Sequence, residues 1–116
     1  MAQFMLILGT DPDAPNESLG KGLTGEQIMQ KYGEWTRTLI EQKRLVESHK
    51  LFDGQGRRVT WSGGQATDGP FVETKETVGG YYVIEARDQA EAVLVAKTCP
   101  TVVFQGGWCE VRAVEI

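Results

Sequence analysis

The sequence Tyr-Tyr-Val-Ile-Glu-Ala at residues 81–86, followed by Asp-Gln-Ala-Glu at 88–91, decides the expected fold. The first stretch is apolar on both faces of an extended chain, which is typical of a strand covered on both sides. Asp88 favours the N-terminal cap of a helix, so a helix is expected from there to about residue 97. Cys99-Pro100 should then end that helix, because proline disfavours helical backbone in the residue before it.

A similar strand and helix are expected nearer the N-terminus. Residues 3–9 are apolar on both faces, which predicts another central strand. Thr-Gly-Glu-Gln at residues 24–27 forms a capping box, in which the two outer side chains each accept a hydrogen bond from the other's backbone amide. Apolar residues at helical spacing predict a helix from about 25 to 43. They are Ile28, Tyr32, Trp35 and Leu39.

Four weaker segments complete the expected elements. Residues 45–51 alternate weakly between apolar and polar, and residues 108–116 alternate clearly. Residues 57–61 and roughly 66–75 flank Ser-Gly-Gly-Gln at 62–65, which predicts a β-hairpin. The order β-α-β, hairpin, β-α-β indicates an α+β fold of the ferredoxin-like, split βαβ type with an inserted hairpin.

The composition narrows the class of protein. All 116 residues are expected to form one domain, residues 1–116. A net charge of -4 argues against a nucleic-acid partner, which usually needs a basic surface. The sequence has no run of about 18 apolar residues and no signal-peptide pattern, so we expect a cytoplasmic protein without a membrane span. One histidine and two cysteines without ligand spacing predict no metal site. The sequence also lacks a glycine-rich phosphate loop, so we expect no cofactor.

A second copy of the chain is the expected partner. Two helices can cover only one face of the predicted sheet, yet residues 3–9 and 81–86 are apolar on both faces. A homodimer is the simplest way to cover the second face.

The stretch Asp-Gly-Pro-Phe-Val-Glu-Thr-Lys-Glu at residues 68–76, followed by Gly-Gly-Tyr-Tyr at 79–82, resembles the signature of the DGPF-motif branch of the YCII-related family. Cys99-Pro100 and Glu-Val-Arg at 110–112 agree with it. The resemblance implies a ferredoxin-like fold, a dimeric α+β barrel, and a cleft between the sheet and the motif loop. Fusions of family members to sigma-factor-like regulators also imply a link to transcription control.

The sequence departs from the better-known YCII branch of that family. That branch resembles an enzyme because it pairs a histidine on the first helix with an aspartate. Here residues 30–35 of the first helix contain no histidine, and the sole histidine, His49, lies on the following strand. The His/Asp chemistry therefore cannot be transferred by position.

The motif residues have a structural and a functional interpretation. Asp68 either caps an Asx-turn with Gly69, or acts at the cleft as a general base or as a carboxylate that orients a ligand. The charged residues Glu73, Lys75 and Glu76 form either a solvent-exposed segment whose charges neutralise one another or a ligand site. In the second case Lys75 binds an anionic ligand, while Glu73 or Glu76 acts as an acid or a base.

Four residues outside the motif are also site candidates. His49 is either a proton shuttle, because its ordinary pKa lies near neutrality, or a hydrogen-bonded strand residue. Arg112 either binds a ligand carboxylate or cross-links strands or subunits. Tyr32 and Trp35 on the first helix are candidate contacts for a small anionic or aromatic ligand.

Three functions are compatible with these residues. The first is a cofactor-independent enzyme of the lyase or isomerase type that uses acid-base residues near the motif. The second is a non-catalytic ligand-binding or regulatory domain associated with transcription control. The third is an assembly protein that uses its sheet only to dimerise.

Overall fold

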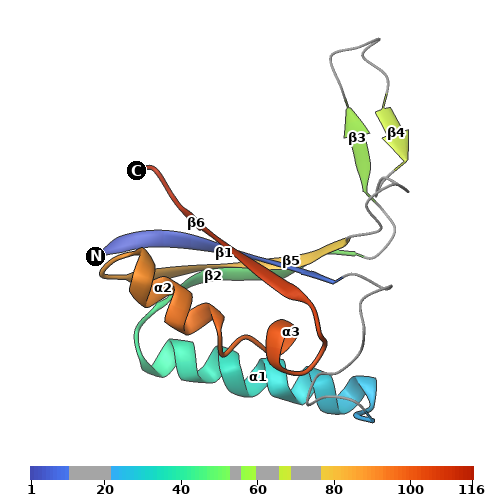
Figure 1. Cartoon of the computed structure of the whole chain (residues 1–116), viewed down its shortest axis with the longest axis horizontal. Helices are drawn as coiled ribbons and strands as arrows, with labels where there is room; N and C mark the ends of the chain where they lie inside the picture. The colour runs from blue at the N-terminus through green and yellow to red at the C-terminus, as the bar shows by residue number, and fades with distance from the viewer. Residues whose placement is uncertain (11–21, 53–55, 60–65, 69–76) are drawn as a thin grey trace.

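The structure is a computed structural model that describes residues 1–10, 22–52, 56–59, 66–68 and 77–116 (Figure 1). Within these ranges no helix is long and apolar enough to cross a membrane. In chain order the elements are β1 (Ala2–Thr10), α1 (Gly25–Glu41), β2 (Leu45–Lys50), β3 (Arg57–Val59), β4 (Ala66–Asp68), β5 (Thr77–Ala86), α2 (Gln89–Ala96), α3 (Pro100–Val103) and β6 (Trp108–Ala113).

Four strands form one antiparallel sheet in the order β2-β5-β1-β6. β1 and β5 are its central strands, as their apolar sequences predict. β3 and β4 pair separately as the inserted hairpin, which projects beyond the end of the sheet (Figure 1). This α+β arrangement of a four-stranded antiparallel sheet and three helices is compatible with the predicted ferredoxin-like fold.

Several element bounds differ from the sequence-based expectation. α1 ends at Glu41, because Lys43 adopts a φ of 60°, which does not fit a right-handed helix. β5 begins at Thr77 rather than at residue 81. The two hairpin strands have three residues each, and residues 69–76 lie outside the described ranges. α3 is an additional helix that starts at Pro100, where proline fits the first helical position.

All three helices lie on one face of the sheet and bury its apolar side chains (Figure 1). Leu6 and Ile84 from the central strands are completely buried, and Leu39 of α1 is nearly so. Burial of one such side chain stabilises the fold by about 1.5–3 kcal/mol. Cys109 and Val111 of β6 pack against the same core, as the alternation of residues 108–116 predicts.

Both predicted helix caps are present. The Thr24 hydroxyl accepts from the Gln27 amide at 3.1 Å, and the Gln27 side chain accepts from the Thr24 amide at 2.8 Å. At α2 a carboxylate oxygen of Asp88 accepts from the Glu91 amide at 2.9 Å. These local bonds satisfy backbone donors that a helix start leaves unpaired.

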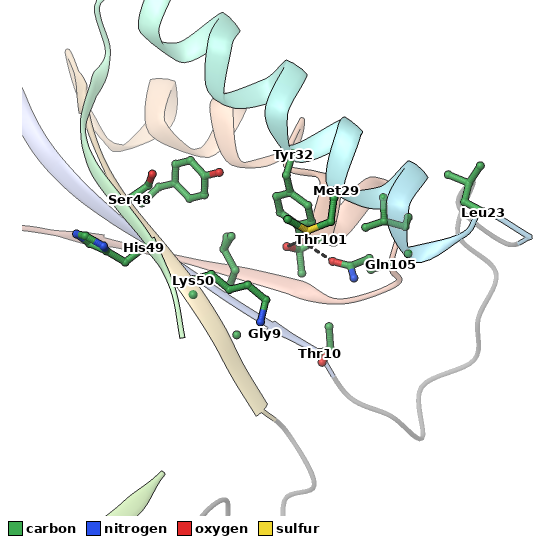
Figure 2. A pocket seen from close by; sticks show the side chains of 16 residues that line it. Gly9, Thr10, Leu23, Met29, Tyr32, Ser48, His49, Lys50, Thr101 and Gln105 are labelled. Carbon is green, nitrogen blue, oxygen red and sulfur yellow. Dashed lines mark hydrogen bonds between the residues drawn. The ribbon is translucent and has the colours of Figure 1, made fainter. Parts of the chain in front are cut away.

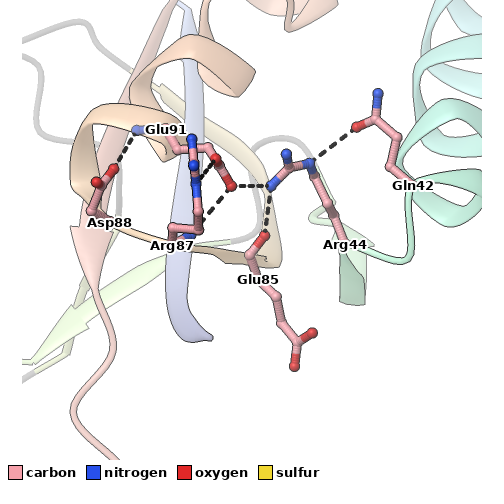
Figure 3. A network of polar contacts seen from close by, with 6 residues as sticks. All are labelled: Gln42, Arg44, Glu85, Arg87, Asp88 and Glu91. Carbon is pink, nitrogen blue, oxygen red and sulfur yellow. Dashed lines mark hydrogen bonds and ion pairs between the residues drawn. The ribbon is translucent and has the colours of Figure 1, made fainter.

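Hydrogen bonds and ion pairs connect the start of α2 to the neighbouring strands (Figure 3). Glu91 of α2 accepts from Arg44 Nη1 at 2.7 Å and from Arg87 Nε at 2.6 Å. Arg44 also donates to the Glu85 carbonyl of β5 at 3.1 Å. The hydrogen bonds from Arg44 and then from Arg87 lower the pKa of the Glu91 carboxyl to about 2, so it is ionised near neutral pH.

No described helix covers the opposite face of the sheet, which we call the open face (Figure 1). It carries Met5 and Ile7 of β1, Val83 of β5, and two polar contacts at its edges. Glu47 contacts the His49 imidazole on β2, and Glu110 forms an ion pair with Arg112 on β6. The open face therefore combines an apolar centre with polar edges.

Candidate functional site

A pocket of about 740 Å³ lies between the N-terminal half of α1 and the adjoining ends of β1, β2 and β5 (Figure 2). Its volume falls in the range of about 300–1,000 Å³ that is usual for small-molecule sites. The apolar side chains that line it are Leu8, Leu23, Ile28 and Met29.

Glycines keep the sheet side of this pocket open. Gly9, Gly79 and Gly80 line it and contribute no side chains to fill it. The β1–β5 register shifts beside them, where Leu8 pairs with Gly80 and Gly9 pairs with Val78. A Cβ at Gly79 would meet no atom of other residues within 4 Å, whereas a Cβ at Gly80 would lie 2.8 Å from the His49 carbonyl oxygen. Gly80 thus lets β2 approach closely.

A hydrogen-bonded cluster forms the polar wall of the pocket (Figure 2). The Tyr32 hydroxyl of α1 donates to the side-chain oxygen of Gln105 and is hydrogen-bonded to the Thr101 hydroxyl of α3. Burial raises the pKa of Tyr32 to about 12, so its hydroxyl stays protonated near neutral pH. Thr101 is only 2% exposed. The cluster therefore presents neutral donors and acceptors in fixed positions.

Lys50 supplies positive charge at the rim of the pocket. It extends from the end of β2 toward Gly9 and Thr10 of β1 (Figure 2) and donates to the Leu51 carbonyl oxygen at 3.2 Å. Among the described lining residues there is no aspartate or glutamate. A ligand with an apolar body and an anionic or hydrogen-bond-accepting group matches these surroundings.

The YCII-related domain model matches residues 3–116, nearly the whole chain. The chain belongs to the YCII-related family. No curated protein matches it. The pocket described above is thus a feature of a YCII-related domain whose first helix contributes Tyr32 to the wall.

Of the predicted site residues on α1, Tyr32 lines the pocket of this YCII-related chain and Trp35 lies behind it. Trp35 is 7% exposed and belongs to the core. Its indole N–H donates to the Thr98 hydroxyl at 2.9 Å, and its ring meets the Tyr82 ring edge-on at 4.6 Å between centroids. Trp35 therefore supports Tyr82, which lines the pocket, without lining it itself.

His49 contributes its backbone to the pocket, while its imidazole lies on the open face. Ser48 and Lys50 pair with Tyr82 and Gly80 and occupy the pocket side of β2, so the alternation of the strand sends His49 to the other face. Its ring lies 5.6 Å from that of Tyr81 and is 62% exposed (Figure 2). The imidazole consequently points away from the Tyr32 cluster.

The remaining predicted residues lie away from the described pocket or outside the described ranges. Arg112 is 71% exposed on the open face, 3.7 Å from Glu110. The backbone of Asp68 pairs with Arg57 in the hairpin. The Asp68 side chain and all of Glu73, Lys75 and Glu76 lie outside the part of the chain that the structure describes.

Sequence reasoning missed Thr101, Gln105, Ser48 and Lys50 as pocket residues. Pro100 could have pointed to Thr101, because proline is common at the first position of a helix and so predicts the short helix α3. In that helix Thr101 contacts Tyr32 of α1. Nothing in the local sequence distinguishes Gln105 from a solvent-exposed side chain. Within the described residues, no group of three or more His, Cys, Asp or Glu side chains could hold a metal ion.

Proposed function

We propose that this YCII-related protein belongs to the DGPF-motif branch and binds a small organic molecule in the pocket under α1. The ligand has an apolar, preferably aromatic, body and an anionic or hydrogen-bond-accepting group. The observation that carries the proposal is the lining of the pocket, which combines apolar side chains with the Tyr32 cluster and Lys50. Asp68-Gly69-Pro70-Phe71 supports the assignment to the branch.

The two kinds of lining have different roles. Leu8, Ile28 and Met29 remove the ligand body from water, which supplies most of the affinity. Tyr32 and Lys50 orient its polar group, because a protonated hydroxyl and an ammonium both donate hydrogen bonds to an anion.

Binding without proton transfer fits the described lining best. A general base needs a pKa near the working pH and a position next to the ligand. The pKa of Tyr32 is about 12, so this hydroxyl does not accept a proton near neutral pH. The described lining has no carboxylate, and the imidazole of His49 lies on the open face. We therefore propose ligand binding at the described lining, and the resemblance to the DGPF-motif branch favours a role in transcription control.

A second copy of the chain covers the open face in this proposal. The apolar centre formed by Met5, Ile7 and Val83 is flanked by the Glu110–Arg112 ion pair and the Glu47–His49 contact, and two such faces can meet around a twofold axis. An interface of this kind buries more than about 1,200 Å² in total. Light scattering at micromolar chain concentration should give twice the chain mass of 12.8 kDa. A monomer under these conditions contradicts the dimer.

The ligand proposal can be tested with anilinonaphthalene sulfonate, a fluorescent probe with an aromatic body and an anionic group. Lys50→Met should weaken its binding roughly tenfold, about 1.4 kcal/mol, by removing a charge-assisted contact. Lys97→Met is the matched control, because Lys97 is an exposed residue at the end of α2. Equal loss of affinity in both variants would show that the probe senses only net charge.

A second pair of variants tests whether the probe occupies the pocket. Ser48→Leu should block binding, because Ser48 lines the pocket from the pocket side of β2 and the larger side chain fills space there. Gly33→Leu introduces the same side chain on the exposed surface of α1, where a Cβ meets no atom of other residues within 4 Å, and should leave binding unchanged. Undiminished binding by Ser48→Leu would place the probe elsewhere and refute the proposed site.

A further inference from the structure

Gln105 reaches the pocket from the turn that follows α3, and the backbone of this turn is held on both sides of it. The Gly107 amide donates to the Thr101 carbonyl oxygen at 2.8 Å, and Gly106 has a φ of 64°, a conformation that suits glycine. A Cβ at Gly107 would lie 2.3 Å from the Gly9 carbonyl oxygen, so the turn lies directly against β1. The fold thus fixes the position from which the Gln105 side chain extends.

A chain of hydrogen bonds sets which end of the Gln105 amide faces a ligand. The side-chain oxygen of Gln105 can only accept, so the Tyr32 hydroxyl donates its single hydrogen to it. The Thr101 hydroxyl must then be the donor in its hydrogen bond with Tyr32. The donors therefore all run in one direction, from Thr101 through Tyr32 to Gln105. The polar group left at the end of this chain is the Gln105 amide nitrogen, which carries two hydrogens.

The amide nitrogen of Gln105 lies on the side of the group that faces the sheet. Figure 2 shows the Gln105 oxygen turned to Tyr32 and the nitrogen turned toward the strands that carry Lys50 and Thr10. Within the described part of the chain, no hydrogen bond engages this nitrogen. The pocket thus presents two different donors to a ligand, an uncharged amide and the ammonium of Lys50.

We propose that the pocket selects an organic monocarboxylate and that Gln105 is the residue that determines this specificity. One carboxylate oxygen accepts from the Gln105 amide nitrogen, and the other faces the Lys50 ammonium. This inference rests on the ligand-binding function proposed above and names the chemical class of its ligand.

A singly charged, planar acceptor fits these donors better than other polar groups do. Lys50 is the only cationic side chain among the described lining residues, since the His49 imidazole lies on the open face, so a phosphate dianion would keep an unbalanced charge. A ligand ammonium only donates and would meet two donors here. An uncharged hydroxyl could accept from Gln105, but hydrogen bonds to an ionised acceptor are roughly twice as strong as those between neutral groups.

The test compares naphthoate with the corresponding uncharged alcohol, naphthylmethanol, by their displacement of anilinonaphthalene sulfonate. The wild-type protein should bind naphthoate roughly tenfold more tightly than the alcohol. Gln105→Glu keeps an oxygen that accepts from Tyr32 but replaces the amide nitrogen with a second anionic oxygen. It should weaken naphthoate binding at least about tenfold, because like charges repel. The affinity for the alcohol should stay the same or rise, because the new oxygen accepts from its hydroxyl.

Gln42→Glu is the matched control. Gln42 is exposed at the C-terminal end of α1, away from the pocket, and its side-chain oxygen also accepts a hydrogen bond, from Arg44. This variant adds the same charge and should leave both affinities unchanged. Equal loss of naphthoate binding in the two variants, or a parallel loss of both ligands in Gln105→Glu, would overturn the proposal.

Gln105→Met removes the amide without adding a charge. It should reduce the preference of the protein for naphthoate over the alcohol, and an unchanged preference would contradict the role of Gln105.

The same measurements separate this inference from the binding function on which it rests. If Ser48→Leu shows that the sulfonate probe occupies the pocket, but naphthoate binds no better than the alcohol, carboxylate selection is refuted and ligand binding stands. If neither the probe nor the two naphthalene ligands bind the wild-type protein, both proposals are refuted.

Discussion

The contact between Gly9 and Trp108 gives a prediction whose size follows from the structure. Gly9 of β1 pairs with Trp108 of β6, and a Cβ at Gly9 would lie 2.0 Å from Cζ2 and 2.3 Å from Cε2 of the indole. No real Cβ approaches another atom so closely, so Gly9→Ala must displace the indole. Overpacking of this kind costs about 1–3 kcal/mol of unfolding free energy.

A double-mutant cycle separates this clash from any other effect of the substitution. Trp108→Val removes the indole and keeps a residue that suits a strand. In that background Gly9→Ala should stabilise the protein by about 0.5–1 kcal/mol, because glycine in a strand interior loses more backbone entropy than alanine. The effect of Gly9→Ala should thus differ between the two backgrounds by about 1.5–4 kcal/mol.

Urea denaturation at one fixed chain concentration measures the four proteins of the cycle. Each 1 kcal/mol moves the midpoint by roughly 0.3–1 M urea at the usual m-values. Light scattering on the same samples establishes that association is unchanged, since the stability of a dimer depends on concentration. Gly33→Ala is the control without a clash and should stabilise α1 by up to about 1 kcal/mol. An equal cost of Gly9→Ala with and without Trp108 would refute the contact.

Three further predictions concern the caps, the polar network and the motif. Thr24→Ala and Asp88→Ala should each lose about 1 kcal/mol in urea denaturation, and unchanged midpoints would contradict the capping bonds. Glu91→Gln should destabilise the protein near neutral pH. The lowered pKa of Glu91 stabilises the fold fully above the ordinary value of 4.5, and this stabilisation is lost as pH falls through about 2. The wild-type and variant midpoints should therefore converge toward pH 2, and a gap that stays constant with pH would exclude the ion pairs. Asp68→Asn and Lys75→Met should keep the circular dichroism spectrum but abolish probe binding if the motif acts on the ligand, whereas a purely structural motif would lower stability and leave affinity unchanged.

Tyr32 and His49 show which features of the candidate site the sequence predicts and which it does not. Helical spacing predicts that Tyr32 lies on the inner face of α1, and it does line the pocket. Its partners Thr101 and Gln105 are 69 and 73 residues away in the chain, so no local pattern could join them to it. The alternation of residues 45–51 puts Glu47 and His49 on one face of the strand, where their side chains lie 3.6 Å apart. Which side of the sheet that face becomes depends on the pairing of β2 with β5.

The sequence by itself determined the features that depend on neighbouring residues. Thr24 and Asp88 begin helices because their side chains reach backbone amides three residues away, and the alternation of residues 108–116 places Cys109 in the core. Only the tertiary structure decided the pocket and its polar wall. Both require α1 and α3 to meet on one face of the sheet. The burial of apolar surface drives this packing, and it does not specify which distant residues come into contact.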